Sequence, residues 1–350
     1  MRAIAASIGV AALAVAALFV AACSAPAAAP AAPAPTWRSA RSLPGPRFEA
    51  YAAVAEGKIF YLGGITGVMG DQKSARESDR LDVYDPVTDA WSSGPSLPAG
   101  GPKHHLAVAV IPSAGGGGIE RIYLLGGFTG IIGGADVAGR FVPNAQTWVL
   151  EGGVHGSWRR LADQPLARGS ATAQAIDGTI YVAGGGADEK GAFTDVLAYD
   201  PIADRWSKRA SMETPREHVS SCALTGRMLV IGGWAGDDRI TVTANESYEP
   251  AHDRWSSLPA MLTSRGGMGA AAIGDVCHVV GGERWDRGLP GTFAIAESFD
   301  VVRGTWHSDP PMPTARHGIG VASLGGSIYV VGGGPIMGNS YTDVVEVFTP

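Results

Sequence analysis

An internal repeat constrains the fold of this 350-residue chain more than any other feature of its sequence. A short apolar run ending in two glycines recurs six times, and the runs are rich in the β-branched and aromatic residues typical of strands. Self-similarity with a period of about 50 residues indicates stacked structural units, none of which can bury both of its faces alone. The glycine pairs are Gly63–Gly64, Gly126–Gly127, Gly184–Gly185, Gly232–Gly233, Gly281–Gly282 and Gly332–Gly333.

Two further spacings fix the register of the repeat. In four units an aromatic residue, itself followed by an acid, stands seven positions before a tryptophan. Five tryptophans are followed ten positions later by an arginine, and the first glycine of the next pair comes 16 positions after that. The second unit is looser, because Trp148 and Trp158 stand ten apart, Lys103 replaces the arginine, and residues 112–121 are inserted. The regular pairs are Tyr84–Trp91, Tyr199–Trp206, Tyr248–Trp255 and Phe299–Trp306, and then Trp37–Arg47, Trp158–Arg168, Trp206–Arg216, Trp255–Arg265 and Trp306–Arg316.

Each unit predicts four short antiparallel strands. A small-residue strand follows the arginine, the strand with the glycine pair comes next, the third ends at the aromatic–acid step, and the fourth begins at tryptophan. These motifs resemble the kelch repeat over about residues 37–350. The resemblance implies an all-β, six-bladed β-propeller with four strands in each blade and tryptophans packed between blades. The glycine pair is expected to relieve crowding where the second strand bends out of its sheet.

The two ends of the repeat predict how the ring closes. The last unit stops after its third strand, whereas Trp37 begins a strand that belongs to no preceding unit. Residues 36–43 are therefore expected to supply the fourth strand of the last blade, which removes an exposed sheet edge.

The first 22 residues are expected to be a lipoprotein signal peptide that takes no part in the fold. Arg2 provides the positive n-region, residues 4–20 are apolar, and small residues precede Cys23. This arrangement resembles the bacterial lipobox, which implies an acylated Cys23 and an exported protein anchored in the cell envelope. Ser24 in the next position implies the outer membrane, facing the periplasm. The alternative is an ordinary secretory signal cut nearby.

An alanine- and proline-rich segment, residues 23–35, is expected to be a semi-rigid tether to the propeller of residues 36–350. After it only Cys222 and Cys277 remain. They could form a disulfide in an oxidising compartment, but no framework spacing supports one. Two buried thiols are the preferred interpretation.

Strand alternation predicts which face of the propeller is functional. The connections from fourth to first strands share one face with the loops from second to third strands, whereas the opposite face has tight Asp-Pro turns. The arginines precede the first strands, so they are expected near the axis on the face with the longest loops, where binding residues tend to lie. These loops are residues 65–80, 128–146, 186–194, 234–244, 283–296 and 334–341.

Six cations are thus expected around the pore mouth of a chain whose net charge is −6. Guanidinium groups match carboxylates in bidentate geometry, so the ring predicts an acidic ligand. In the structural alternative the arginines brace neighbouring loops through carbonyl groups, or acids such as Glu49, Glu217 and Glu283 neutralise them. The candidate ligand-binding cations are Arg47, Lys103, Arg168, Arg216, Arg265 and Arg316.

Histidines follow the cation in alternate units, at His105, His218 and His317, with His104 beside the first. A three-fold metal site would require imidazoles from separate blades to meet at bonds of about 2 Å. The channel of a six-bladed ring is expected to be too wide for that. We therefore predict no metal or other cofactor and assign the three histidines to the polar, ligand-binding lining of the pore.

Three further residues, Trp234, Arg284 and Trp285, follow glycine pairs directly and begin upper loops. Exposed aromatic rings beside an arginine suit stacking on a sugar or gripping a peptide. The alternative is that each tryptophan packs against its own loop.

The leading functional hypothesis is a binding or scaffold module. The sequence contains no HExxH, GxSxG, P-loop or CxxC motif, and its acidic balance argues against nucleic acid. The arginine-bearing face is expected to bind an envelope protein, an acidic glycan or a small acidic ligand. We expect a monomer that contacts the membrane only through its lipid anchor.

Two enzymatic alternatives remain open. Some exported kelch proteins resemble mutarotases or epimerases of sialic acid, which need an arginine for the substrate carboxylate and an acid/base near the anomeric oxygen. A copper oxidase similar to the galactose-oxidising kelch enzymes would need a tyrosine–cysteine crosslink, for which cysteines inside predicted strands are poorly placed. The candidate catalytic pairs for the mutarotase are Arg216 with Glu217 and Arg284 with Glu283.

Overall fold

The computed structural model describes residues 34–112, 120–131, 140–187, 191–236, 240–285 and 291–350. The chain divides into two compact units, of which Pro35–Pro350 is the second. The predicted signal peptide, Cys23 and nearly all of the tether lie outside the described residues. Within the described ranges, no helix has the length and apolar character needed to cross a membrane.

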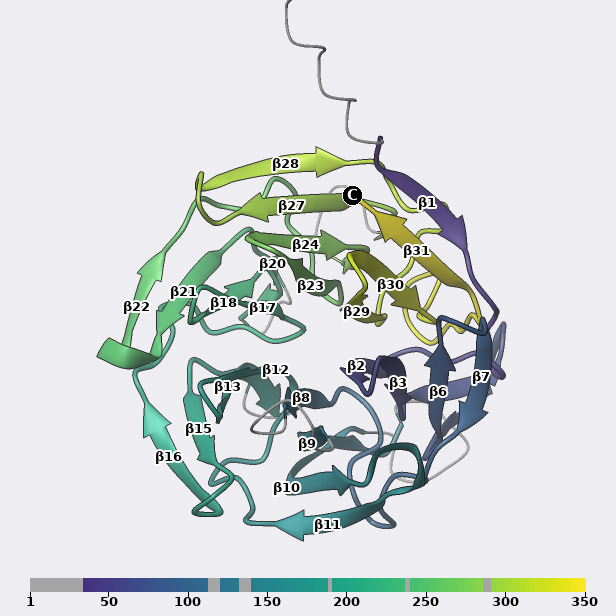
Figure 1. The fold of residues 1–350 in the computed structure, drawn as a ribbon, viewed down its shortest axis with the longest axis horizontal. Coiled ribbons are helices and arrows are strands. Elements are labelled where there is room, and N and C mark those ends of the chain that lie inside the picture. The colour runs from purple at the N-terminus through teal and green to yellow at the C-terminus, as the bar shows by residue number, and fades with distance from the viewer. Residues whose placement is uncertain (1–33, 113–119, 132–139, 188–190, 237–239, 286–290) are drawn as a thin grey trace, which may run out of the picture. The chain divides into compact units, whose positions relative to one another are not determined.

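The described residues form six four-stranded antiparallel sheets arranged as blades around one axis, which confirms the all-β, six-bladed propeller (Figure 1). The first strand of each unit lies nearest the axis and the fourth lies on the perimeter. Blades 1 to 3 consist of β2(Tyr51–Ala55), β3(Lys58–Leu62), β6(Leu81–Asp85) and β7(Ala90–Ser93); β8(Ala107–Ile111), β9(Arg121–Thr129), β10(Val142–Glu151) and β11(Ser157–Leu161); and β12(Gly169–Ile176), β13(Thr179–Ala187), β15(Val196–Asp200) and β16(Arg205–Arg209).

The remaining blades repeat the same strand order, and short additional strands follow the second strand in blades 1, 3, 4 and 5. Blades 4 to 6 consist of β17(Ser220–Leu224), β18(Arg227–Ile231), β21(Asn245–Glu249) and β22(Arg254–Ser257); β23(Gly269–Ile273), β24(Val276–Val280), β27(Ala296–Asp300) and β28(Thr305–Asp309); and β29(Gly320–Leu324), β30(Ser327–Val331), β31(Val345–Thr349) and β1(Thr36–Ser39). The other elements are β4(Ile65–Val68), β5(Asp71–Glu77), β14(Gly191–Ala192), β19(Trp234–Ala235), β20(Ile240–Thr241), β25(Glu283–Arg284), β26(Gly291–Thr292) and two 3-10 turns, Gly153–His155 and Pro250–His252.

The ring closes as the sequence predicts. Strand β1 pairs antiparallel with β31, so the last blade takes its fourth strand from the N-terminal side of the propeller. Trp37 stands opposite Phe348, and the two ring centroids are 5.0 Å apart.

The tryptophan spacing has two structural causes. The seven-residue step carries the chain around a tight turn and returns the tryptophan opposite its aromatic partner, as in the pairing of Tyr199 with Trp206. Each indole nitrogen then donates a hydrogen bond of 2.8–3.3 Å to a main-chain carbonyl of the preceding blade. The tryptophans therefore join neighbouring blades at the perimeter. The donor–acceptor pairs are Trp37–Pro310, Trp91–Arg41, Trp158–Pro95, Trp206–Ala162, Trp255–Ala210 and Trp306–Pro259.

The glycine pairs are explained by contact with the next blade, more than by a bend within their own sheet. The second glycine of each pair donates its N–H to the carbonyl of the residue at the cation position of the following blade, as Gly282 does to Arg316 at 2.8 Å. A Cβ atom on the first glycine would lie only 2.2–2.9 Å from that same carbonyl oxygen in all six blades. Only glycine permits this approach, because every first glycine also has a positive φ.

The cysteine interpretation is wrong, because Cys222 and Cys277 form a disulfide with a Cα–Cα distance of 6.0 Å. Cys222 lies on the innermost strand of blade 4, and Cys277 lies on the second strand of blade 5. The two strands pack across the interface between blades, a proximity that a separation of 55 residues in sequence does not reveal.

Candidate binding site at the pore mouth

The five repeat arginines are buried inside the blades, so the expected ring of cations at the pore mouth is wrong. Their side chains are at most 1% exposed. The main-chain carbonyl of each arginine accepts a hydrogen bond from a glycine N–H of the preceding blade. The guanidinium group turns into the arginine's own blade, where that of Arg316, for example, donates to the carbonyls of Gly332 and Val344 at 2.8 Å. Four also pair with a third-strand carboxylate at 2.7–3.3 Å, in the pairs Arg47–Asp82, Arg216–Glu246, Arg265–Glu297 and Arg316–Glu346.

The fifth arginine and the lysine of the second unit have equally structural roles. Arg168 donates to the carbonyls of Gly184 and Asp195 at 2.8 and 2.9 Å. The Lys103 ammonium donates to the carbonyl of Pro98 at 2.7 Å. Five of the six positions therefore correspond to the carbonyl-bracing alternative considered from the sequence, whereas Arg47 pairs with the buried carboxylate of Asp82.

A closed belt of main-chain hydrogen bonds surrounds the axis two residues after each cation. In every blade the N–H at this position donates to the carbonyl at the same position of the preceding blade, at 2.8–3.2 Å. The belt residues all have a positive φ, between 51° and 64°. This left-handed conformation costs a non-glycine residue about 1–2 kcal/mol. The members of this axial belt are Glu49, His105, Ser170, His218, Gly267 and Gly318.

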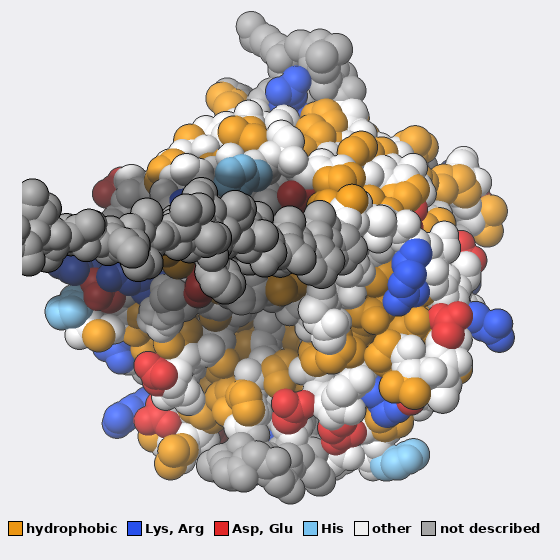
Figure 2. All heavy atoms as spheres, turned by 45° about the horizontal axis from the view of Figure 1, so that its top comes forward, with side chains coloured by type: hydrophobic (Ala, Val, Ile, Leu, Met, Phe, Trp, Pro, Cys, Tyr) orange, Lys and Arg blue, Asp and Glu red, His pale blue; other side chains and the backbone are white. Residues whose placement is uncertain are grey.

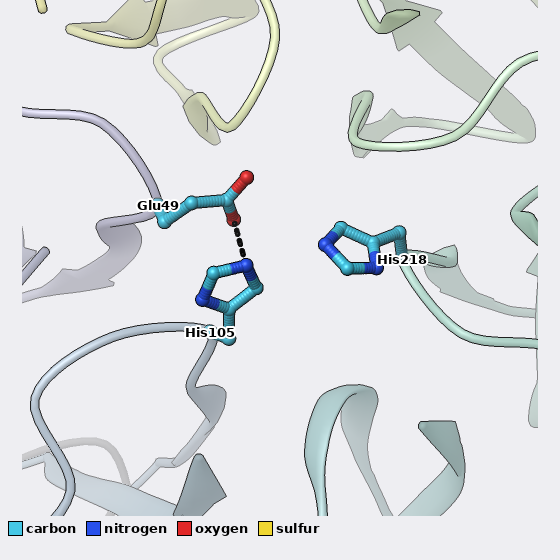
Figure 3. Close-up of side chains that lie close together, drawn as sticks. All are labelled: Glu49, His105 and His218. Carbon is cyan, nitrogen blue, oxygen red and sulfur yellow. Dashed lines mark ion pairs between the residues drawn. The ribbon is translucent and has the colours of Figure 1, made fainter. Parts of the chain in front are cut away.

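The axial belt gathers three titratable side chains that are distant in sequence. Figure 3 shows Glu49, His105 and His218 pointing toward one another from three different blades. One ligand-type atom from each lies within 4.8 Å of the other two. Glu49 Oε2 is 3.5 Å from His105 Nε2, and the two imidazole centroids are 5.0 Å apart. The reason given against a metal, a channel too wide for histidines to meet, is therefore wrong for His105 and His218.

The third predicted histidine lies outside this cluster. His317 stands one residue after its cation instead of two, and its Nδ1 lies 3.0 Å from the carbonyl of Gly334. Burial lowers the pKa of His317 to about 4. Glu49 occupies the place that the sequence hypothesis gave to His317. The signal was present in the sequence, because aligning the units on their cations puts Glu49, His105 and His218 in one column.

The cluster is largely buried, and further carboxylates lie near it. The pKa of the Glu49 carboxyl is raised to about 8, first by burial and then by the nearby carboxylates of Glu283 and Glu217. Tyr51 donates its hydroxyl to Glu49 Oε2 at 3.5 Å, which opposes that rise. Glu49 and His105 are each 3% exposed.

Hydrogen bonds fix the tautomer of His105. His104 Nε2 lies 2.8 Å from the carbonyl of Gly130 and must donate its proton there. Burial lowers the pKa of His104 to about 4, so its ring is neutral and its Nδ1 is an acceptor. The Nδ1 of His105, 2.6 Å away, is then the donor of that pair. The other ring nitrogen, His105 Nε2, faces Glu49 Oε2 at 3.5 Å.

The predicted tryptophans separate into one buried and one exposed residue. Trp234 is 3% exposed and stacks on the ring of His218 with centroids 4.0 Å apart. Trp285 is 44% exposed. Arg284 is half-buried and lies over the ring of Phe293, with 5.9 Å between its guanidinium carbon and the ring centroid.

Neither candidate catalytic pair is assembled as a sugar isomerase requires. Arg216 is buried against Glu246, while Glu217 lies beside His218. Glu283 Oε2 lies 3.6 Å from His317 Nε2. A cavity of about 130 Å³ opens on the axis beside Glu49 and His218, and no arginine lines it among the described residues.

Exposed apolar side chains gather in the connections of the loop-bearing face. Figure 2 shows acidic and basic side chains interspersed on the surface it displays, without a patch of one sign. Among the described residues, three of the exposed large apolar side chains lie at the tight turns of the opposite face, at Val87, Ile202 and Val302. The other seven belong to the loop-bearing face: Val68, Met69, Val142, Ile240, Leu262, Trp285 and Ile336.

Blade number, ring closure and inter-blade bonding define the class of this protein as a six-bladed β-propeller with one loop-rich face. The chain belongs to the kelch-repeat family. Residues 120–333 match the KLHDC2/KLHL20/DRC7 Kelch-repeats domain, and residues 46–98 match the Kelch motif.

Known relatives share the repeat region at low identity. The chain is 26% identical over 318 residues to Kelch-like protein terF of Aspergillus terreus, which covers 87% of this chain and 65% of that protein. It is 27% identical over 201 residues to mouse Kelch-like protein 35, a match that covers 57% of this chain and 29% of that protein. The chain thus spans less than two thirds of either relative. The structure of YjhT superposes with a TM-score of 0.69 at 15% identity, covering 87% of this chain and 95% of that one, which shows a common fold.

Proposed function

We propose that this protein is a protein-binding scaffold that engages its partner through the loop-bearing face of the propeller. The observation that carries the proposal is the concentration of exposed apolar side chains in the connections of that face. Exposed apolar side chains on the face that also carries the longest loops suit contact with a partner, and exposed aromatic residues such as Trp285 commonly dominate the binding energy of protein interfaces.

The lining of the axial cavities favours a protein over a small acidic ligand or glycan as the partner. The cavity beside Glu49 and His218 measures about 130 Å³, and a second cavity of about 320 Å³ lies farther along the innermost strands. The second one reaches the volume of about 300–1,000 Å³ that is usual for small-molecule sites, but among the described residues its lining is mostly alanine and valine and holds no cation for an acidic ligand. A sialic-acid mutarotase would also need an arginine next to its acid/base, and the described cavity lining supplies none. This alternative is therefore less well supported.

A lipid anchor is the second part of the proposal. Acylated Cys23 would hold the propeller at the outer membrane, facing the periplasm. An extended proline-rich chain spans about 3.1 Å per residue, so the 23–35 tether could reach about 40 Å. Replacing Cys23 with serine should abolish labelling by a fatty-acid probe and move the protein from the membrane to the soluble fraction. Unchanged labelling or fractionation would contradict the anchor without affecting the binding proposal.

Site-specific photocrosslinking tests the binding face. A photoreactive phenylalanine analogue replaces Trp285 or Ile336 on the loop-bearing face of the full chain, expressed in its own cells. The controls replace Val87 or Ile202, which are apolar residues on the opposite face and are more exposed than either test residue. We expect one adduct of defined mass from both loop-face positions and none from the controls. Equal adducts from both faces, or adducts from the controls alone, would refute the proposal.

A further inference from the structure

The residues of the axial belt indicate a selected site instead of incidental packing. Gly267 and Gly318 show that glycine satisfies the left-handed backbone at this position. Yet Glu49, His105 and His218 hold the same strained conformation with φ near 51°. Strained non-glycine residues cluster at functional sites, where the side chain supplies what glycine cannot. The three side chains in question all converge on one point (Figure 3).

The surrounding residues position these side chains as those of a metal site. His105 is oriented by the contact of its Nδ1 with His104 Nδ1 at 2.6 Å, and His104 Nε2 lies 2.8 Å from the Gly130 carbonyl, so that His105 Nε2 faces Glu49. Histidine ligands of metals are oriented by such an outer hydrogen bond. His218 is held by its stack on Trp234. A Cβ atom at position 318 would come within 2.6 Å of Glu49 Oε1, so glycine there makes room for the carboxylate.

The distances suit one ion with little rearrangement. Metal–ligand bonds of about 2.0–2.1 Å in a tetrahedron place neighbouring ligand atoms about 3.3 Å apart. Glu49 Oε2 and His105 Nε2 are already 3.5 Å apart, and all three ligand atoms lie within 4.8 Å. Glu217 and Glu283 add negative potential around the cluster.

We propose that Glu49, His105 and His218 form a binding site for a single divalent transition-metal ion on the propeller axis. Two imidazoles and one carboxylate favour Zn²⁺ and similar ions over Ca²⁺ and Mg²⁺, which prefer oxygen ligands alone. Three protein ligands leave a fourth tetrahedral position for water or for a carboxylate of a bound partner. Ser170, the belt residue between the two histidines, is 1% exposed, and its hydroxyl has no hydrogen-bond partner among the described residues. That hydroxyl can bind the water at the fourth position.

Glycine substitutions make an unusually clean test. His105→Gly and His218→Gly remove a ligand and also relieve the left-handed strain, which offsets part of the stability lost with the ring contacts of each histidine; the far-UV circular dichroism of each variant checks that it is folded. The matched control is His252→Ala/His307→Ala, which removes two exposed histidines and tests nonspecific surface binding.

The experiment is calorimetric titration of the purified full chain with Zn²⁺, with Mg²⁺ as the comparison ion. Wild type and the surface control should bind one equivalent of Zn²⁺ with the same Kd, and Zn²⁺ should raise their Tm. Each glycine variant should bind about 100-fold more weakly or not at all. Co²⁺ in place of Zn²⁺ should give the visible absorption of a tetrahedral complex in wild type only. Absence of stoichiometric binding, or binding that persists in both glycine variants and is lost in the surface control, overturns the proposal.

This test is independent of the scaffold proposal. Loss of Zn²⁺ binding with unchanged loop-face crosslinking would establish the metal site as separate from partner docking. Crosslinking that fails in wild type while Zn²⁺ still binds would reject the scaffold alone.

Discussion

Removing one buried arginine should destabilise the whole propeller. Arg316 donates to the carbonyls of Gly332 and Val344 and pairs with Glu346 at 2.7 Å, with its own side chain 0% exposed. Methionine at position 316 would fill most of the same volume but would make none of these bonds. The substitution would leave the Glu346 carboxylate, 3% exposed, without its cation.

The expected loss follows from that burial. Breaking a buried ion pair by deleting one partner costs about 3–5 kcal/mol, mainly because the remaining charge stays buried. Glu346 keeps one hydrogen bond, from Thr314 Oγ1 at 2.8 Å, which places the expected loss toward the lower end of that range. A second change, Glu346→Gln, removes the stranded charge. The double variant should therefore recover part of the stability lost by Arg316→Met.

Urea unfolding of wild type and of these two variants measures the differences in stability directly. The control is Arg159→Met, because Arg159 pairs with Glu151 at 3.1 Å on the surface with its side chain 56% exposed. Exposed pairs contribute about 0.2–1 kcal/mol. A loss for Arg316→Met no larger than that of Arg159→Met would refute the structural role of the repeat arginines. A double variant less stable than Arg316→Met would refute the explanation by buried charge.

Three further predictions concern the contacts between and within blades. Replacing both Cys222 and Cys277 with serine should lower the free energy of unfolding by about 4 kcal/mol, because the disulfide closes a 55-residue loop in the unfolded chain. Urea unfolding measures this free energy, and an unchanged value would contradict a native disulfide. Gly281→Ala should lower the free energy of unfolding far more than Gly57→Ala. Both glycines have φ near 65°, but only at Gly281 would the new Cβ lie 2.5 Å from a carbonyl oxygen. Equal losses of stability would show that the positive φ alone accounts for the repeat glycines. The Tm should fall as the pH drops below about 4, because hydrogen bonds from a tyrosine hydroxyl and then from a main-chain N–H lower the pKa of a turn aspartate in three blades. A carboxyl whose pKa is lowered in the folded state contributes stability that is complete above its ordinary pKa of 3.8 and is lost as the pH falls through the folded-state pKa. Replacing these aspartates with asparagine should therefore lower the Tm at pH 7 and make the fall of Tm with acid shallower. An unchanged dependence of Tm on pH would contradict this explanation. The aspartates are Asp89, Asp204 and Asp253.

The architecture was predictable because the repeat expresses it directly in spacing. The seven-residue step from Tyr199 to Trp206 corresponds to one turn and one antiparallel pair. The unpaired Trp37 strand and the last unit without a tryptophan predicted ring closure, which the β1–β31 pairing confirms. These features depend on local strand order, which sequence periodicity records.

The site was only partly predictable because it depends on contacts between units. Spacing located the arginines at the start of the first strands but not the turn of their side chains into the blades. It likewise could not show that Cys222 faces Cys277 across an interface. The histidines were recognised, yet grouping His317 with His105 and His218 ignored a one-residue difference in register. His317 stands one residue after its cation, whereas the members of the axial belt stand two residues after theirs. For this reason Glu49, and not His317, completes the cluster.

Anomalous X-ray diffraction at the zinc edge, from crystals grown with Zn²⁺, tests most directly whether the axial belt assembles a functional centre. We predict one strong peak on the axis, within about 2.0–2.2 Å of one atom each of Glu49, His105 and His218. A map with no axial peak, or with zinc only at exposed histidines such as His252, would contradict it.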